Sequence, residues 1–239
     1  GSVIEREFDY ELIKFVTKLS NKELNERLSV LRDSELIYER GIYPKSTYIF
    51  KHALTRSVVY DSILTKKKQQ LHDKIGNAIE ELYIENINEF YGVLVKHFFE
   101  SLNYYKAAKY SMLAGKKAET SASFADAISY AKIRITCLEK LSNTEDTERE
   151  IIEARTKLGY YYIRMDYFAE AKTPIDPIVD LARNYGYNKE LSEIKSIIGI
   201  YEWSVEEDFQ SGITSLKEGL TISEKFDDIA LSRLPNYWL

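Results

Sequence analysis

The 239-residue chain is poor in the residues that build secreted, fibrous or membrane proteins. It has one cysteine, Cys137, which excludes an internal disulfide framework and favours a reducing cytoplasm. Four prolines and ten glycines are too few for a linker-rich protein. It lacks a run of ~18 uncharged apolar residues and a secretory signal. We therefore expect a cytoplasmic protein with no membrane partner.

Basic residues are also not in excess. The chain has 33 lysines and arginines against 38 aspartates and glutamates, a net charge of -5. Nucleic-acid affinity depends heavily on neutralisation of phosphates, so this balance gives it no general support. A hydrophobic content of 44% and a charged content of 30% agree with an all-helical globular module.

The most informative segment is residues 158–171, LGYYYIRMDYFAEA. A Leu-Gly pair and Tyr162 lie on one expected helix, and after a short turn a second helix opens with Phe168 and carries Ala171. This order of features is the consensus skeleton of a tetratricopeptide repeat. Such a repeat cannot bury its apolar face alone and needs stacked neighbours. The segment therefore predicts an array that binds partners and rarely performs chemistry.

Degenerate copies of this pattern lie on both sides. The positions equivalent to Ala171 are Ala127 and Gly212, which are 44 residues before and 41 residues after it. Both intervals exceed the ~34 residues of the standard repeat, and long helices with polar loops account for the excess. We expect residues 84–239 to form a tetratricopeptide-like superhelix that is truncated at its C-terminus. We infer a piece cut from a longer protein.

The first part of the chain has a different pattern. Residues 10–19 are apolar at helical spacing, and Ser20 with Glu23 makes a capping box that opens a second helix. Two short segments then have the composition of β-strands, residues 36–40 and 47–50. The pattern predicts two helices followed by one β-hairpin.

This order is that of a winged helix. Pro44 lies in the loop between the two strands, where a turn is expected. A further helix over residues 52–64 is expected to pack behind the hairpin, and its inward face is expected to hold Leu54, Val58, Val59 and Ile63. We therefore expect a mainly α protein with a winged-helix-like subdomain and trailing helices over residues 3–83.

Residues 48–64 (YIFKHALTRSVVYDSIL) and 66–72 (KKKQQLH) resemble the region after the NTPase core in bacterial STAND/AAA-type signalling ATPases. These proteins are often fused to class III adenylate or guanylate cyclase domains or to LuxR-like output domains. In them, a winged helix and then tetratricopeptide repeats follow the ATPase. The resemblance implies a non-catalytic interaction and regulatory module, which couples partner or ligand binding on the repeats to the NTPase domain of the same chain.

The resemblance also gives His52 a possible role. In related switch ATPases, a Met-His-Asp motif contributes a histidine that contacts the phosphates of bound ADP. Lys51, His52 and Ala53 lie at the matching place, so only the histidine is retained. The resemblance implies that His52 senses nucleotide in the full-length parent, and the alternative is that it merely caps the hairpin or packs at the helix start. The chain has no GxxxxGK[ST] loop and is not expected to bind nucleotide tightly alone.

Other chemistry is weakly indicated. His72 lies on a polar stripe and is expected at the surface, whereas His97 is expected to pack at the edge of the core. Neither belongs to a metal-ligand spacing, and Cys137 is expected to be a buried thiol. We expect no catalytic residue, no metal and no cofactor in this chain.

Partner binding is expected on the repeats. Aromatic and arginine residues are enriched at binding hot spots, and Tyr161, Arg164 and Trp203 are the candidates to line a groove. Pro174 and Pro177 are expected to delay or kink the helix in which they lie.

Two alternatives remain: a DNA-binding transcriptional regulator that reads DNA with the winged helix, and a scaffold for oligomerisation. The expected recognition helix, residues 22–35, carries four carboxylates, which argue against specific nucleic-acid binding. The lysines at 66–68 favour a charge cluster at a helix start over a nucleic-acid site.

Overall fold

A computed structural model describes residues 1–42, 46–226 and 229–239. The protein is mainly helical, and the described residues form thirteen α-helices and one small antiparallel sheet. The chain divides into two compact units, Gly1–Ala107 and Ala108–Leu239. Within the described residues, no helix has both the length and the apolar character that crossing a membrane requires.

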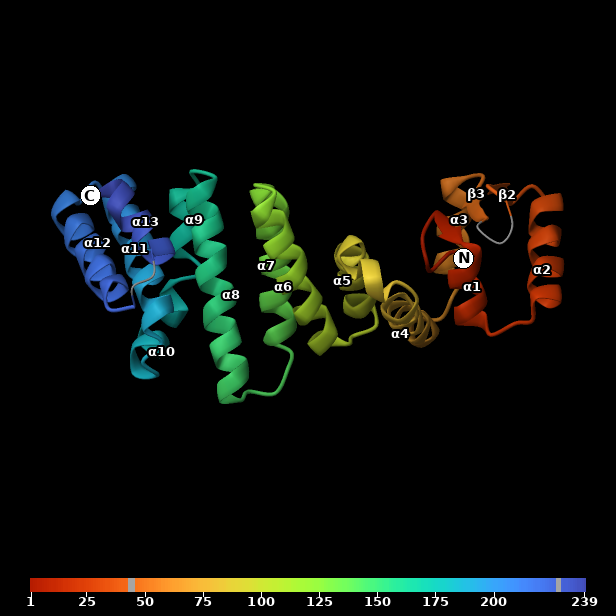
Figure 1. The fold of residues 1–239 in the computed structure, drawn as a ribbon, viewed down its shortest axis with the longest axis horizontal. Helices are drawn as coiled ribbons and strands as arrows, with labels where there is room; N and C mark the ends of the chain where they lie inside the picture. The colour runs from red at the N-terminus through yellow and green to blue at the C-terminus, as the bar shows by residue number, and fades with distance from the viewer. Residues whose placement is uncertain (43–45, 227–228) are drawn as a thin grey trace. The chain divides into compact units, whose positions relative to one another are not determined.

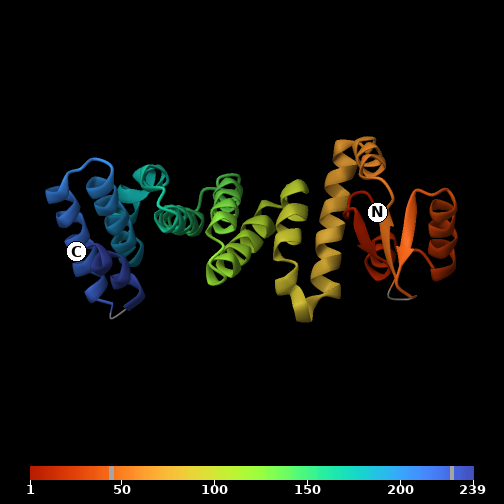
Figure 2. The same ribbon diagram turned by 90° about the horizontal axis from the view of Figure 1, so that it is seen from above.

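The first unit begins with the sheet and ends in α-helices (Figures 1 and 2). Its elements, in chain order, are β1 (Glu7–Asp9), α1 (Tyr10–Thr17), α2 (Asn21–Asp33), β2 (Ile37–Arg40), β3 (Thr47–Phe50), α3 (Ala53–Asp61), α4 (Thr65–Leu82), the 3-10 helix η1 (Ile84–Glu89) and α5 (Tyr91–Glu100). Helix α6 (Tyr104–Thr120) follows, and the division between the units falls within it.

The expected hairpin is present, but the sheet has a third strand that the sequence did not predict. The strand order is β1-β3-β2, and both pairings are antiparallel. β1 has only three residues, and its one apolar side chain, Phe8, is buried and stacks on Tyr48 with ring centroids 5.9 Å apart. A strand this short has no periodic signal of its own, since its pairing partner lies some forty residues away. Pro44 lies outside the described residues.

Helix α2 begins at the predicted capping box. The backbone N–H of Glu23 donates to the Ser20 hydroxyl at 3.3 Å, and the backbone N–H of Ser20 donates to the Glu23 carboxylate at 3.1 Å. These two bonds satisfy two of the amides that every helix start leaves unpaired. Leu24 and Leu28 then pack inward.

Helix α3 contradicts the expected packing. None of its residues is buried, and Leu54, Val58 and Val59 are 75%, 61% and 43% exposed instead of facing inward. The side that faces the unit carries Tyr60, whose hydroxyl lies 3.0 Å from Nε2 of His72. Hydrophobic residues need not be inside, and here polar groups hold the helix in place.

The second unit is a succession of packed helices (Figures 1 and 2). After α6 its elements are α7 (Phe124–Leu138), α8 (Glu145–Arg164), α9 (Phe168–Lys172), the 3-10 helix η2 (Asp176–Ile178), α10 (Val179–Asn184), α11 (Asn188–Ser204), α12 (Phe209–Glu224) and α13 (Ile229–Trp238). The broken stretch between α9 and α10 contains Pro174 and Pro177, which confirms the predicted interruption.

One turn geometry recurs between successive helices. Each of these turns has one residue with a left-handed backbone, and the positions are Leu102, Ala122, Asp166, Gly186 and Glu207. At the first four, the next residue donates its backbone N–H to the carbonyl five residues earlier at 2.8 to 2.9 Å. This is the Schellman arrangement that ends an α-helix. The chain therefore reverses in the same way several times.

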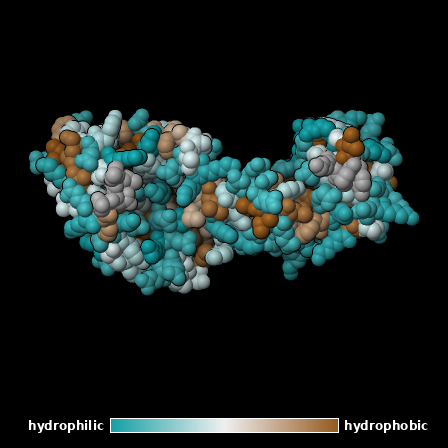
Figure 3. All heavy atoms as spheres, viewed as in Figure 1, coloured by the Kyte–Doolittle hydropathy of each residue, from teal (hydrophilic) through white to brown (hydrophobic). Residues whose placement is uncertain are grey.

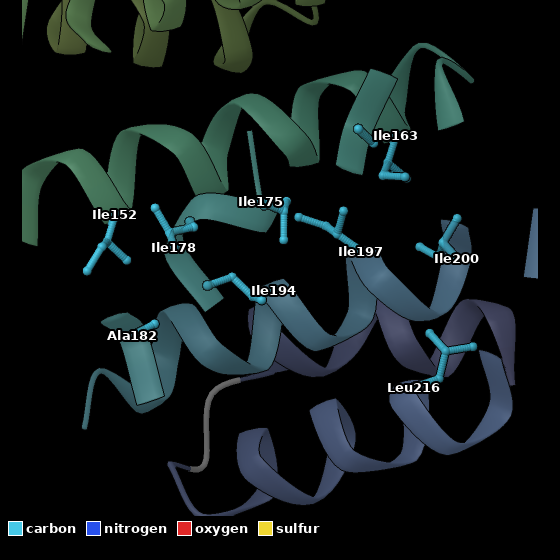
Figure 4. Close-up of a cluster of buried hydrophobic side chains, with 10 residues drawn as sticks. Ile152, Ile163, Ile175, Ile178, Ala182, Ile194, Ile197, Ile200 and Leu216 are labelled. Atoms are coloured by element: carbon cyan, nitrogen blue, oxygen red, sulfur yellow. The ribbon is translucent and has the colours of Figure 1, made fainter. Parts of the chain in front are cut away.

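The main apolar core of the second unit contains seven isoleucines (Figure 4). They are joined by Ala171, Ala182 and Leu216 and come from α8 to α12 and the segment between α9 and α10. Small residues bring the helices together at its edges. A Cβ at Gly159 would lie 2.9 Å from Ile175 Cδ1, and a Cβ at Gly199 would lie 2.8 Å from the carbonyl oxygen of Gly212. α11 and α12 therefore touch through their backbones.

Candidate binding groove

A groove with a volume of about 640 Å³ opens on the second unit. Three basic and three acidic side chains line it together with aromatic and aliphatic ones. The lining residues are Glu119, Lys157, Tyr160, Ile163, Arg164, Asp166, Glu193, Arg233, Leu234, Tyr237 and Trp238. They come from α6, α8, α11, α13 and the turn after α8. Ligand sites combine a hollow with a few converging polar groups, and this groove has both.

An ion pair joins two of the helices that line the groove. Nζ of Lys157 on α8 lies 3.1 and 3.3 Å from the two carboxylate oxygens of Glu193 on α11. Burial acts to lower the pKa of Lys157, but the Glu193 carboxylate outweighs burial and holds the pKa above its usual value. The pair neutralises both groups, so neither offers a full charge to a ligand.

Arg164 is held differently. Its guanidinium carbon lies 4.7 Å from the centre of the Phe124 ring and 5.9 Å from that of Tyr160, and Nη1 donates to the Tyr160 hydroxyl at 3.1 Å. It has no carboxylate partner among the described residues, and the side chain is exposed. Stacking fixes an arginine while leaving donors free for an anion. Arg164 therefore keeps guanidinium N–H groups that no described carboxylate occupies.

Helix α13 contributes the remaining wall. Tyr237 is 84% exposed, and Trp238 packs edge-on against Phe168 with ring centroids 5.7 Å apart. Arg233 lies on the same helix and forms no ion pair with any described residue. Two arginines without an ion pair among the described residues, together with the exposed ring of Tyr237, thus border one hollow.

A second hollow of about 400 Å³ adjoins the groove, because Glu119 and Lys157 line both. Small residues on α6 and α7 make room for it, among them Gly115, Ala127 and Ala131. Tyr161 lies at this hollow and donates its hydroxyl to Glu119 at 3.0 Å. Burial and then the Glu119 charge raise the pKa of Tyr161, which keeps the phenol protonated.

The structure separates the three residues that the sequence proposed for partner binding. Arg164 lines the larger groove, and Tyr161 is buried beside the smaller hollow. Trp203 lines neither, because it packs edge-on against Phe209 at 5.0 Å and lies against Gly212. Sequence reasoning did not identify Lys157, Glu193 or the residues of α13. The pair Lys157–Glu193 joins residues 36 positions apart, and no local pattern indicates it.

His52 lies in the first unit, immediately before α3. Its backbone is extended, its side chain is exposed, and it makes no capping hydrogen bond. The His52 side chain therefore neither caps the helix nor packs at its start. Its exposed imidazole is free to contact another molecule.

A buried histidine pair in the first unit corrects the expectation for His72. His72 on α4 is 1% exposed and not at the surface, and His97 on α5 is fully buried. Their Nδ1 atoms lie 2.9 Å apart, so one Nδ1 carries a proton and donates a hydrogen bond to the other, which has no proton. Tyr60 closes the other side of His72, while Nε2 of His97 has no partner among the described residues.

The pair is held neutral. Burial, and to a smaller extent the positive charge of Lys96, lowers the pKa of His72 to about 4. Burial, and to a smaller extent the neighbouring His72, lowers the pKa of His97 to about 3. If both rings were protonated, both Nδ1 atoms would be donors and their hydrogen bond would be lost.

Metal chemistry finds no support in the geometry. Among the described residues, no group of three or more histidine, cysteine, aspartate or glutamate side chains is placed to hold a metal ion. Cys137 is buried, and burial raises the pKa of its thiol to about 11, so it is not a reactive thiolate.

Neither the models of known protein families nor the curated protein sequences give a match to this chain.

Proposed function

We propose that this chain is a non-catalytic interaction and regulatory module whose second unit binds a protein partner in the groove beside Arg164. The observation that carries the proposal is an exposed arginine, oriented by two aromatic rings and without a carboxylate partner among the described residues, in a hollow of about 640 Å³. Arginine and aromatic residues dominate binding hot spots. A peptide with an acidic residue next to an aromatic or apolar one fits this lining.

A tetratricopeptide-like identity for the second unit is part of the proposal. The recurring turns support it, and so do the small residues Ala127, Ala171 and Gly212, which are buried at equivalent places after each turn. Repeats of this kind present an extended binding surface. We assign the first unit a winged-helix-like role on its order of two helices and a hairpin.

The parent protein is proposed to be a STAND-type signalling ATPase. In this account, binding in the groove is coupled to the NTPase domain of the same chain, and His52 contacts the bound nucleotide there. The exposed position of His52 at the start of α3 supports a contact with a group beyond residues 1–239. The test is nucleotide release from the full-length parent with His52→Ala, in which ADP is expected to dissociate faster.

The groove is tested on the chain itself. Peptides are selected from a random library on the wild-type chain, and their affinity is measured for Arg164→Ala and for Arg149→Ala. Arg149 is the matched control because it lies on the same helix and stacks on Tyr187 at 5.4 Å, but does not line the groove. We expect Arg164→Ala to weaken binding roughly tenfold or more and Arg149→Ala to leave it unchanged. Equal losses, or none, would refute the groove as the binding site.

A further inference from the structure

Helix α3 in the first unit has its apolar side chains on the outside. At about 100° per residue, positions 54 and 58 lie on one side of the helix, opposite positions 56 and 60. Leu54 and Val58 are 75% and 61% exposed, whereas Arg56 and Tyr60 turn toward the unit. Leu64, just after the helix, is 80% exposed. The helix is therefore amphipathic with its apolar side unpartnered.

Polar contacts fix this orientation. The Tyr60 hydroxyl lies 3.0 Å from Nε2 of His72, and the Tyr60 ring lies under the ammonium group of Lys68 at 4.4 Å. Arg56 reaches Glu5 at 3.8 Å. Turning Leu54 and Val58 inward would break these contacts, so the apolar side is a fixed surface of the unit. Figure 3 shows hydrophobic side chains at the surface over α3.

The surroundings of this surface are basic in an otherwise acidic chain. Residues 51–74 hold six lysines and arginines against two aspartates, while the whole chain has a net charge of -5. Lys66 and Lys67 lie two and three residues after Leu64, are exposed and form no ion pair within the described part of the chain. The surface therefore favours a partner that brings both apolar side chains and negative charge.

We propose that the outer side of α3, with Leu54, Val58 and Leu64 flanked by Lys66 and Lys67, binds an acidic amphipathic segment of a protein partner. Helix-on-helix docking of this kind uses apolar anchors one turn apart, and charges at the border set the orientation. The site lies in the first unit and does not depend on the groove beside Arg164.

A protein segment fits better than an anionic membrane. The side chains of Asp61 and Glu35 are 75% and 77% exposed next to this surface, and anionic head groups would repel both. Glu35 pairs with Lys51, which precedes α3. A protein partner can place cations opposite these carboxylates, whereas a uniformly negative surface cannot.

The test uses a fluorescent model helix with leucines at i, i+4 and i+7, glutamates along one border of the leucine stripe and neutral residues along the other. Its binding to the whole chain is followed by anisotropy. We expect Leu54→Ser/Val58→Ser and Lys66→Glu/Lys67→Glu each to weaken binding roughly tenfold. Val30→Ser is the matched control, since Val30 on α2 is 64% exposed in the same unit. Melting curves verify that each variant stays folded. If Leu54→Ser/Val58→Ser does not fold, Lys66→Glu/Lys67→Glu still tests the site.

Four results would overturn the proposal. One is the absence of binding to the wild-type chain at ~1 mM, and another is an equal loss in Val30→Ser. A third is binding to phosphatidylserine vesicles that depends on Leu54 and Val58 while the peptide does not bind. The fourth is a concentration-dependent dimer that Leu54→Ser/Val58→Ser abolishes, which would make a second copy the occupant. A lysine-bearing version of the helix is expected not to bind.

Discussion

The two units differ in the character of one buried cluster in each, although both bury apolar side chains elsewhere. Where α3, α4 and α5 meet in the first unit, the interior is polar and contains Tyr60, His72 and His97 in one hydrogen-bonded chain. The core of the second unit is apolar, with seven isoleucines and backbone contacts at Gly199 and Gly212. The stability of a buried polar cluster depends on the protonation state of its groups, whereas the stability of a buried apolar cluster depends on how closely its side chains fill the space. The units should therefore fail under different perturbations.

The largest expected effect is the loss of stability of the first unit in acid. Unfolded histidines take up protons below pH ~6.5, whereas the buried pair does so only well below this value. The pair's contribution is thus fully present above pH 6.5 and falls as the pH drops toward the folded pKa values. Between pH 7 and pH 5 we expect a loss on the order of 3 kcal/mol for the two rings.

Hydrogen exchange at pH 7 and pH 5, corrected for the intrinsic rate, measures this loss helix by helix. Protection of α4 and α5 is expected to fall, while that of α11 and α12 changes little. His72→Gln/His97→Leu is the control and is expected to flatten the pH dependence in the first unit. An equal loss in both units would remove the contrast between their interiors.

The next largest effect is expected from overfilling the second unit. A leucine at Gly199 would place its Cβ 2.8 Å from the Gly212 carbonyl oxygen and from Leu216 Cγ, so α11 and α12 would have to move apart. We expect Gly199→Leu to destabilise the second unit by about 3 kcal/mol. The control is Gly115→Ala, because a Cβ there meets only Tyr130 Cβ, at 3.6 Å. Urea unfolding followed by circular dichroism measures both, and similar curves would contradict the account.

Gly159→Leu gives a smaller effect of the same kind. Its Cβ would lie 2.9 and 3.0 Å from Ile175 side-chain atoms and 3.2 Å from the Ala171 carbonyl oxygen. A side chain yields more readily than a backbone, so we expect a cost of ~1–3 kcal/mol. An unchanged melting temperature would show that the isoleucine core adapts to added volume.

Substitutions on the exposed side of α3 should hardly change the free energy of unfolding. Leu54→Ser/Val58→Ser removes apolar groups that touch solvent, and surface substitutions of this kind usually stay within about 0.5 kcal/mol. Thermal unfolding of the isolated chain checks this. A loss above about 2 kcal/mol would mean that these side chains support the fold of the first unit.

The smallest effect is expected for the binding of duplex DNA. Arg32 on α2 pairs with Glu39 at 2.9 Å, and Glu26 is exposed on the same helix, so α2 presents few free cations. We expect no specific duplex binding at ~150 mM salt. Selection from random duplexes followed by anisotropy measures this, and one enriched motif bound at nanomolar affinity would instead favour a transcriptional regulator.

Local signals were sufficient for much of the fold. The capping box at Ser20, the hairpin strands and the break at Pro174 and Pro177 could be predicted because their physical causes lie close together along the chain. The tight approach at Gly159 involves the more distant Ala171 and Ile175, and the small residue in the Leu-Gly-Tyr pattern indicated it.

Contacts between distant positions could not be predicted. Strand β1 pairs across some forty residues, and Nδ1 of His72 meets its partner on a different helix. Of the candidate site, Arg164 was proposed because arginine and aromatic residues are enriched at binding hot spots, whereas Glu193 and Trp238 reach the groove only through tertiary packing. The polar stripe containing His72 indicated a surface because nothing in the sequence shows that α5 covers it.

The most direct test of the central claim is hydrogen–deuterium exchange of the chain with and without a peptide selected on it. Binding in the groove predicts new protection in α8 near Lys157 and Arg164 and in α13 near Trp238, and none in α2. The same protection should disappear with Arg164→Ala and remain with Arg149→Ala. Protection confined to the first unit, or spread over the second unit but absent from α8 and α13, would contradict the assignment of the groove as the partner site.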